Sequence, residues 1–170
     1  MTSLPRRIVF YSLLSLLFLV IDSTLVKFLA IANIAPDILV IWVVYVAIRE
    51  GQIAGATAGF LIGLTMNLMG LLGTSNGMLG LLPLAKTLAG FTAGYFYNEN
   101  KTYNTLGGYQ FIVIVGVSSM VHNIVYFIIF LQGSELSWIQ SVLYHGVPAT
   151  AYTAAVALLP MFAFARKYLS

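Results

Sequence analysis

Hydrophobic residues fill six long runs of this chain, and polar residues gather in short segments between them. A helix rises about 1.5 Å per residue and the hydrocarbon core of a bilayer is about 30 Å thick, so each crossing needs about 20 apolar residues. Most of the runs approach that length, which predicts an all-α membrane protein with a bundle of about six transmembrane helices. The expected spans are Ile8 to Leu29, Pro36 to Ile48, Ile53 to Leu72, Leu79 to Tyr97, Tyr109 to Leu131 and Ile139 to Ala165.

Two of these spans are unusual. The first follows Arg6 and Arg7 as the core of a signal peptide would, but it is too long, and Asp22 and Lys27 stand where a cleavage site would be. We interpret it as a retained span. The second is short for a crossing, which either local thinning of the bilayer or a backward extension into Ile34 would accommodate.

The composition agrees with a membrane protein. Hydrophobic residues make up 60% of the 170 residues and charged residues 8%, whereas soluble domains carry about 25% charged residues. The mean hydropathy is +0.95. Because no linker, charge run or low-complexity stretch divides the chain, we expect a single transmembrane domain over residues 1–170.

The positions of the basic residues predict the orientation. In a six-span chain only Lys27 falls at one membrane surface, and the positive-inside rule places the other surface, with both termini, in the cytoplasm. The net charge of +3 is too small and too scattered for nucleic-acid binding. The basic residues expected at the cytoplasmic surface are Arg6, Arg7, Arg49, Lys101, Arg166 and Lys167.

The sequence offers little for catalysis. The absence of cysteine excludes disulfides, thiolate metal sites and cysteine nucleophiles. We find no Ser, His and Asp constellation and no carboxylate pair placed for acid and base catalysis. Two histidines do not complete a metal site. The sequence therefore predicts a protein that is not an enzyme, without catalytic residues, metal or cofactor.

The third span contains a stripe of glycines at Gly51, Gly55, Gly59 and Gly63, spaced four residues apart on nearly one helix face. Small residues at this spacing let another helix backbone approach closely, where van der Waals contacts drive association in lipid. We favour packing within the chain, with a partner helix as the alternative. Gly90 and Gly94, in the fourth span, are a candidate internal counterpart.

Seven polar residues lie within or beside the expected spans, mostly at depths in the outer half of the bilayer. Each is costly in hydrocarbon and marks either a site or a buried pair. An outer polar pocket and a set of interhelical hydrogen bonds both remain open as interpretations. The set consists of Asp22, Asp37, Asn67, Lys86, His122, Asn123 and His145.

Lys86 is the polar residue whose charge most needs a partner. Asp22 lies at a similar estimated depth, so we expect it to neutralise Lys86, with Asp37 as the second candidate. Asp37 follows Pro36 and reads first as a signal for a helix start, because a carboxylate suits the helix dipole there. The glycine-rich segment Gly70 to Gly80 reads as a turn or re-entrant loop rather than a phosphate loop.

Three stretches resemble the MreD family of the bacterial rod-shape system. They read PDILVIWVVYVAIREG from Pro36 to Gly51, then IAGATAGFLIGL, then LAKTLAGFTAGYFYNENK from Leu84 to Lys101. The family pattern is a P-D that opens a short span, an R-E-G at its end, a G-x-x-x-G-F-x-x-G span and a glycine-rich segment. The family often has an aspartate in the later third span, where this chain has Asn67.

The resemblance implies a non-enzymatic subunit of the peptidoglycan elongation machinery in the bacterial inner membrane. Its fold would be similar to the substrate-binding subunits of energy-coupling-factor transporters. Its partner would be an MreC-like single-span protein, which links it to MreB, RodA and the penicillin-binding synthases.

Two functions are compatible with this sequence. The first is a membrane scaffold that binds the transmembrane helix of the partner. Such a scaffold would also contact membrane lipid and could form a homo-oligomer. The second is a small-solute-binding subunit of a transporter that uses the outer polar pocket. Short outer loops favour the first, because capture of a solute often needs a lid.

Overall fold

We describe a computed structural model over residues 4–32, 34–72, 80–132 and 137–168. These residues form helices and no β-strand. Four segments are long and apolar enough to cross a membrane, which makes the chain a multi-pass membrane protein by length and composition. They are Pro5–Thr24, Gln52–Gly70, Tyr109–Phe130 and Trp138–Ala163.

A helix lies in each of the six segments expected from the sequence, and short helical pieces join or extend them. The elements are α1 (Leu4–Thr24), the 3₁₀ helix η1 (Val26–Leu29), α2 (Ile38–Glu50), α3 (Gln52–Leu72), α4 (Leu81–Gly94), α5 (Thr102–Leu106), α6 (Tyr109–Phe130), α7 (Trp138–Ser141), the π-helical turn η2 (Val142–Gly146), α8 (Val147–Val156) and α9 (Leu158–Tyr168).

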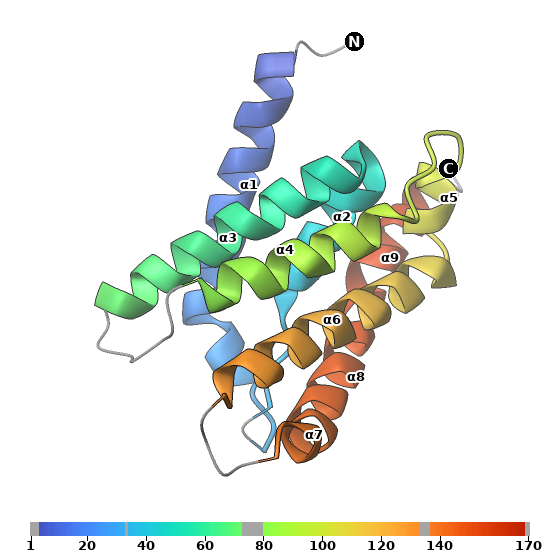
Figure 1. Ribbon diagram of the computed structural model, residues 1–170. Helices are drawn as coiled ribbons and strands as arrows, with labels where there is room; N and C mark the ends of the chain where they lie inside the picture. Colours follow the sequence, from blue (N-terminus) through green and yellow to red (C-terminus); the bar gives the residue numbers. More distant parts are fainter. Residues whose placement is uncertain (1–3, 33, 73–79, 133–136, 169–170) are drawn as a thin grey trace.

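The chain runs back and forth between two ends of the molecule (Figure 1). The start of α1, the junction of α2 with α3 and the connection through α5 lie toward the upper and right part of the view. The ends of α1, α3 and α6 lie toward the lower left. Successive long helices are therefore antiparallel, as short connections in a helical bundle require.

Helix α2 lies at the centre of the fold. It packs against α1, α3, α4, α6 and α8, and its residues from Leu39 to Ile48 are buried with the exception of Tyr45. A helix that is apolar on all sides is stable only when it is covered on all sides. This explains why α2 can be shorter than the hydrocarbon is thick: neighbouring helices, rather than lipid, surround it.

Glycines bring α3 and α4 into backbone contact. A Cβ atom added at Gly55 would lie 2.7 Å from the carbonyl oxygen of Gly90, and one at Gly63 would lie 2.6 Å from that of Leu82. A Cβ at Gly59 would overlap the carbonyl of Lys86. Within the chain these glycines therefore pack against α4, as the favoured interpretation of the stripe expects, and α4 occupies this face of α3.

The remaining glycines of the predicted set have two roles. Gly90 and Gly94 are the counterpart on α4, because added Cβ atoms there would overlap Gly55 and Gln52 of α3. Gly51 differs from the stripe. It ends α2 with a φ of 97°, and its N–H donates to the carbonyl of Ala47. A glycine is favoured there because this backbone conformation is strained for other residues.

The last expected span is not one straight helix. The π-helical turn η2 ends at Gly146, two residues before Pro148, and α8 ends at Val156, four residues before Pro160. Proline lacks the N–H that would bond to the carbonyl four residues earlier, and its ring crowds that carbonyl. Both irregularities therefore follow from proline positions that the hydropathy pattern did not reveal.

The other boundaries differ by a few residues. The first helix ends at Thr24 and is followed by η1 instead of continuing to Leu29. The fourth helix, α4, is shorter than expected at 14 residues. The segment between α3 and α4 that we expected to form a turn or re-entrant loop lies, from residue 73 to residue 79, outside the described residues.

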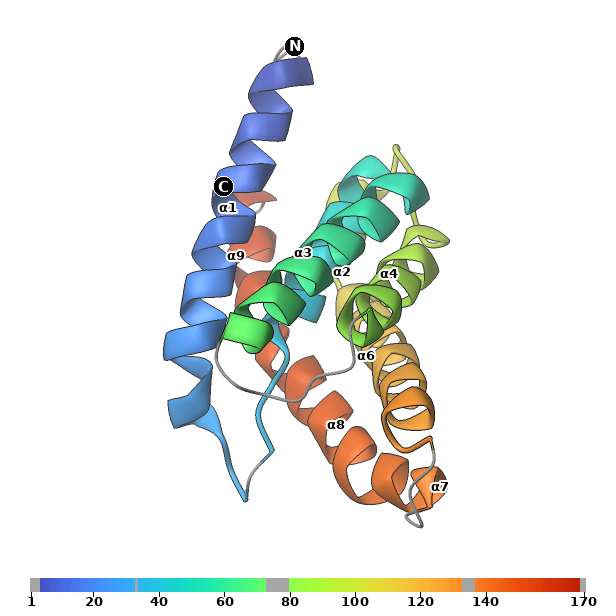
Figure 2. The ribbon, with the colours of Figure 1, turned by 60° about the vertical axis from the view of Figure 1, so that its left-hand side comes forward.

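Helix α1 stands at the periphery. It extends beyond the other helices in Figure 1 and lies at one side of them in Figure 2. Only 6% of its membrane-length window is buried within the protein. In its second half, Phe18 and Leu19 pack against the core around Trp42.

Candidate functional site

A buried ion pair joins the start of α2 to the middle of α4. The Nζ atom of Lys86 donates to Oδ2 of Asp37 over 2.6 Å. The Lys86 side chain is 1% exposed and that of Asp37 is 25% exposed. Two ions removed from water in this way must satisfy one another, because each alone would be strongly disfavoured in a low-dielectric interior.

Two further hydrogen bonds, each involving a backbone N–H group, hold Asp37 in place. Its Oδ1 accepts from the N–H of Val40 over 2.9 Å, which caps the N-terminus of α2. Its own N–H donates to Oγ1 of Thr153, on α8, over 3.0 Å. Pro36 is the residue before this cap, not the first residue of the helix as the sequence suggested.

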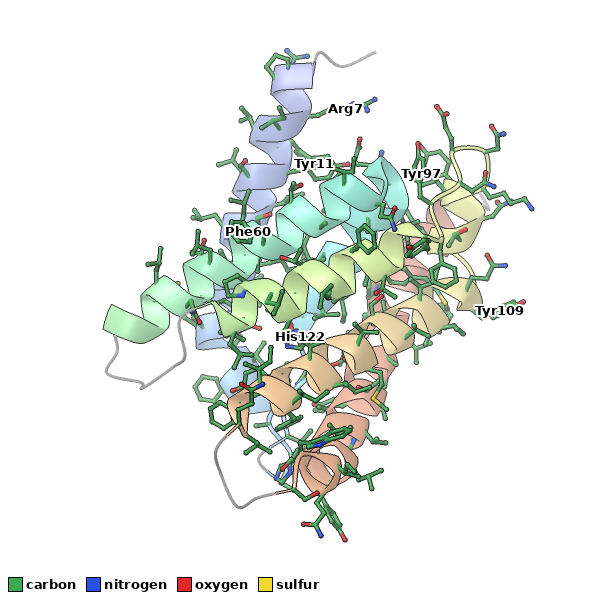
Figure 3. All side chains as sticks on the ribbon, viewed as in Figure 1. Arg7, Tyr11, Phe60, Tyr97, Tyr109 and His122 are labelled. Carbon is green, nitrogen blue, oxygen red and sulfur yellow. The ribbon has the colours of Figure 1, made fainter. Side chains whose placement is uncertain are left out.

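His122 of α6 completes the cluster, which lies near the centre of the molecule (Figure 3). Its Nε2 lies 3.6 Å from Oδ2 of Asp37, and the residue is 6% exposed. Ser118 and Ser119, one turn earlier on α6, are also buried. The Asp37–Lys86–His122 cluster therefore connects α2, α4, α6 and α8 through polar contacts.

The structure changes the expected pairing of Lys86. Its partner is Asp37, the second candidate, and the first candidate Asp22 is wrong. Asp22 lies on the peripheral helix α1, within electrostatic range of Asp37 and Lys86 but without an ion pair to Lys86. Similar depth in the bilayer did not determine which helices are neighbours. Asp37 is also more than a helix-start signal, because one oxygen caps α2 and the other binds Lys86.

The other predicted polar residues lie outside this cluster. Asn123 donates to the carbonyl of Gly146 and to Oγ1 of Thr150, and so joins α6 to η2 and α8 by interhelical hydrogen bonds. His145 is exposed beside the ring of Phe127. Asn67 is buried on α3.

The cluster offers poor coordination for a metal ion. Lys86 occupies the side of Asp37 that faces His122, and an ammonium group there competes with any cation. Among the described residues, no group of three histidine or acidic side chains is placed to hold a metal. The arrangement is suited instead to holding four helices in fixed positions.

A second site was not predicted from the sequence. A groove of about 440 Å³ lies between α1 and α3, lined mainly by apolar and small side chains. At one end it meets a smaller pocket of about 300 Å³ lined by Arg6, Arg7 and Arg49. Its signal in the sequence is the set of Arg6, Arg7 and Arg49, which the positive-inside rule places at one membrane surface.

Hydrogen bonds organise the polar end of this groove. Tyr11, labelled with Arg7 in Figure 3, donates to Oε1 of Glu50 over 2.7 Å. Arg7 lies 3.6 Å from Oε2 of the same carboxylate. Nη1 of Arg49 donates to the hydroxyl of Tyr45 over 2.7 Å. The contacts of Tyr11 and Arg7 with Glu50 attach the first turns of α1 to the last turn of α2.

Comparisons of this chain with family models, with curated proteins and with solved structures found no match.

Proposed function

We propose that this chain is a non-enzymatic scaffold subunit of the bacterial cell-elongation machinery, which seats the transmembrane helix of an MreC-like partner. The motifs that carry the resemblance to the MreD family support this, because they build one structural unit. The P-D pair starts α2, the R-E-G sequence ends it at Gly51, and the glycine pattern joins α3 to α4.

The observation that carries the proposal is the outer face of α1. Phe10, Leu13, Leu17 and Val20 recur at the spacing of one helix face and are each more than half exposed. A membrane-length helix that is attached to its own fold along one side leaves the other side for a second helix. The glycine stripe is occupied by α4, so α1 is the better candidate seat.

We also propose a location and an orientation in the membrane and a set of indirect partners for this chain. The chain would reside in the bacterial inner membrane with six crossings, and α2 can be short because other helices cover it. Both termini would lie in the cytoplasm, and the fold would be similar to energy-coupling-factor substrate-binding subunits. Through the MreC-like protein the chain would be linked to MreB, RodA and the penicillin-binding synthases.

The first prediction concerns the partner seat. Changing Leu13 and Leu17 together to Ala removes packing surface from α1 but keeps the helix apolar. We expect co-purification of a co-expressed MreC-like protein to fall severalfold, because helix association in lipid depends on close van der Waals packing. The amount of partner recovered with the tagged chain is the measurement.

The matched control changes Leu84 and Leu88 to Ala, two exposed leucines with the same spacing on α4. This variant should retain the partner. Equal recovery from both variants would contradict the assignment to α1. Failure of the unchanged chain to bind any MreC-like protein would contradict the proposed function itself.

The second prediction concerns orientation. Single cysteines at Asn100 and Lys101, in the connection between α4 and α5, should be protected from an impermeant thiol reagent added to intact cells. Cysteines at Ile31 and Ser137 should react, because the six-span arrangement places them outside. Labelling after cell lysis serves as the control for accessibility. The reverse pattern would exclude cytoplasmic termini.

The transporter alternative has less support. Of the three charged side chains expected to line an outer pocket, Lys86 and Asp37 are paired with one another. The two cavities described above are lined by other residues, near α1. A small molecule that co-purifies with the chain from native membrane, in place of a protein, would favour this alternative.

A further inference from the structure

The groove between α1 and α3 has the length of one bilayer leaflet. Its lining residues on α3 extend from Ala54 to Thr65, which corresponds to about 16 Å at 1.5 Å per residue. This is about half of the 30 Å hydrocarbon thickness. A transmembrane helix crosses the full thickness, whereas a single acyl chain occupies half of it.

The chemistry of the groove changes along its length. Leu16, Ala58, Leu61 and Ile62 line its deeper part, where an alkyl chain is compatible with the surface. Arg7, Tyr11 and Glu50 line both the groove and the adjoining basic pocket, so the two cavities lie side by side at these residues. An occupant that fills both must have a polar group at one end and a hydrocarbon chain at the other.

The polar end carries a net positive charge. Three guanidinium groups, those of Arg6, Arg7 and Arg49, surround the single carboxylate of Glu50. Glu50 already accepts from Tyr11 and pairs with Arg7. Each guanidinium has five N–H donors, and Arg49 spends one of them on Tyr45. Arginine is the residue best suited to bind phosphate through paired hydrogen bonds.

We propose that this composite site binds an anionic phospholipid, with its phosphate at Arg6, Arg7 and Arg49 and one acyl chain in the groove between α1 and α3. The lipid would fill the space between the peripheral helix and the core and would hold α1 in place. This proposal does not depend on the cell-elongation partner, because it concerns only the chain and its membrane.

Trp42 provides a reporter for the test. Its indole N–H donates over 2.9 Å to Oγ of Ser15, which lines the groove. The chain has two tryptophans, so a Trp138→Phe variant leaves Trp42 as the only one. This variant of the full chain is reconstituted in phosphatidylcholine vesicles that contain a small fraction of phosphatidylglycerol with brominated acyl chains. Bromine quenches tryptophan fluorescence at short range.

We expect brominated phosphatidylglycerol to quench Trp42 severalfold more than brominated phosphatidylcholine at the same low fraction. Arg6→Gln should reduce this headgroup preference and Lys101→Gln should not. Arg6 is exposed at the start of α1, so its replacement leaves the fold intact. Equal quenching by the two lipids would show that Trp42 is surrounded by bulk lipid without a headgroup preference, and it would overturn the proposal.

A second pair of variants tests the groove itself. Thr57 lines it, and Thr57→Phe should block the acyl chain and reduce quenching by phosphatidylglycerol. Thr92→Phe on α4 is the matched control, because both threonines donate to the carbonyl four residues earlier. Unchanged quenching in Thr57→Phe would overturn the proposal. A photo-crosslinker at Thr57 that captures a protein helix, rather than lipid, in native membranes would also overturn it.

Discussion

Replacing Lys86 by Met is expected to lower the free energy of unfolding in detergent by about 3 to 5 kcal/mol, because Asp37 would remain buried without its counter-ion. Met preserves most of the length and apolar stem of the lysine, so the loss reports the charge. Asp37→Asn should have a similar effect. Asn is a good N-cap residue, so this change keeps the cap of α2 while it removes the charge. Thermal unfolding of the purified chain measures both.

The double variant distinguishes a pair from two independent residues. Because the buried ions cost desolvation energy, removing both should destabilise the protein less than the sum of the single changes, by about 0.5 to 3 kcal/mol. Lys101→Met, in the exposed connection before α5, is the control and should be nearly neutral. Additive losses from Lys86→Met and Asp37→Asn would show that the pair does not carry this stability.

Replacing Gly59 by Leu is expected to abolish the folded monomer, a larger effect than loss of the ion pair. The first atom of any side chain at this position overlaps the backbone carbonyl of Lys86, so α3 and α4 would have to separate along their whole contact. Gly59→Ala should already cost about 1 to 3 kcal/mol through overpacking. Size-exclusion profiles and thermal unfolding in detergent measure the two variants.

Gly116 provides the matched control on α6. A Cβ added there would lie 4.0 Å from its nearest neighbour, the Cβ of Ala154, which is an ordinary contact. Gly116→Ala should therefore be neutral or slightly stabilising, since Ala favours a helix over Gly by about 1 kcal/mol. A folded Gly59→Leu monomer would contradict the backbone contact between α3 and α4.

The two effects are connected through one residue. The carbonyl of Lys86 packs on Gly59, and the ammonium group of Lys86 binds Asp37. The absence of a side chain at Gly59 therefore sets the distance between α3 and α4. That distance in turn sets the position of the Lys86 ammonium group. A Gly59→Ala variant should lose part of the coupling between Lys86 and Asp37.

The sequence determined the elements of this protein and one of its contacts. Apolar runs of limited length predicted a helix in each of six segments, because the hydrophobic thickness of a membrane and the rise of a helix together set the number of residues in one crossing. Four of these segments meet the length and hydropathy of a membrane span. The glycine spacing predicted a close helix pair, because only small residues permit it, and α3 with α4 is that pair.

Only the tertiary structure decided which polar residues meet. Asp22 and Asp37 were both plausible partners of Lys86 by depth, but depth is a coordinate along the membrane normal and contains no information about neighbours within the plane. Packing places Asp37 against α4 and leaves Asp22 on the peripheral helix α1. The groove between α1 and α3 depends on packing in the same way, since it exists only where two helices separated along the chain leave a gap between them.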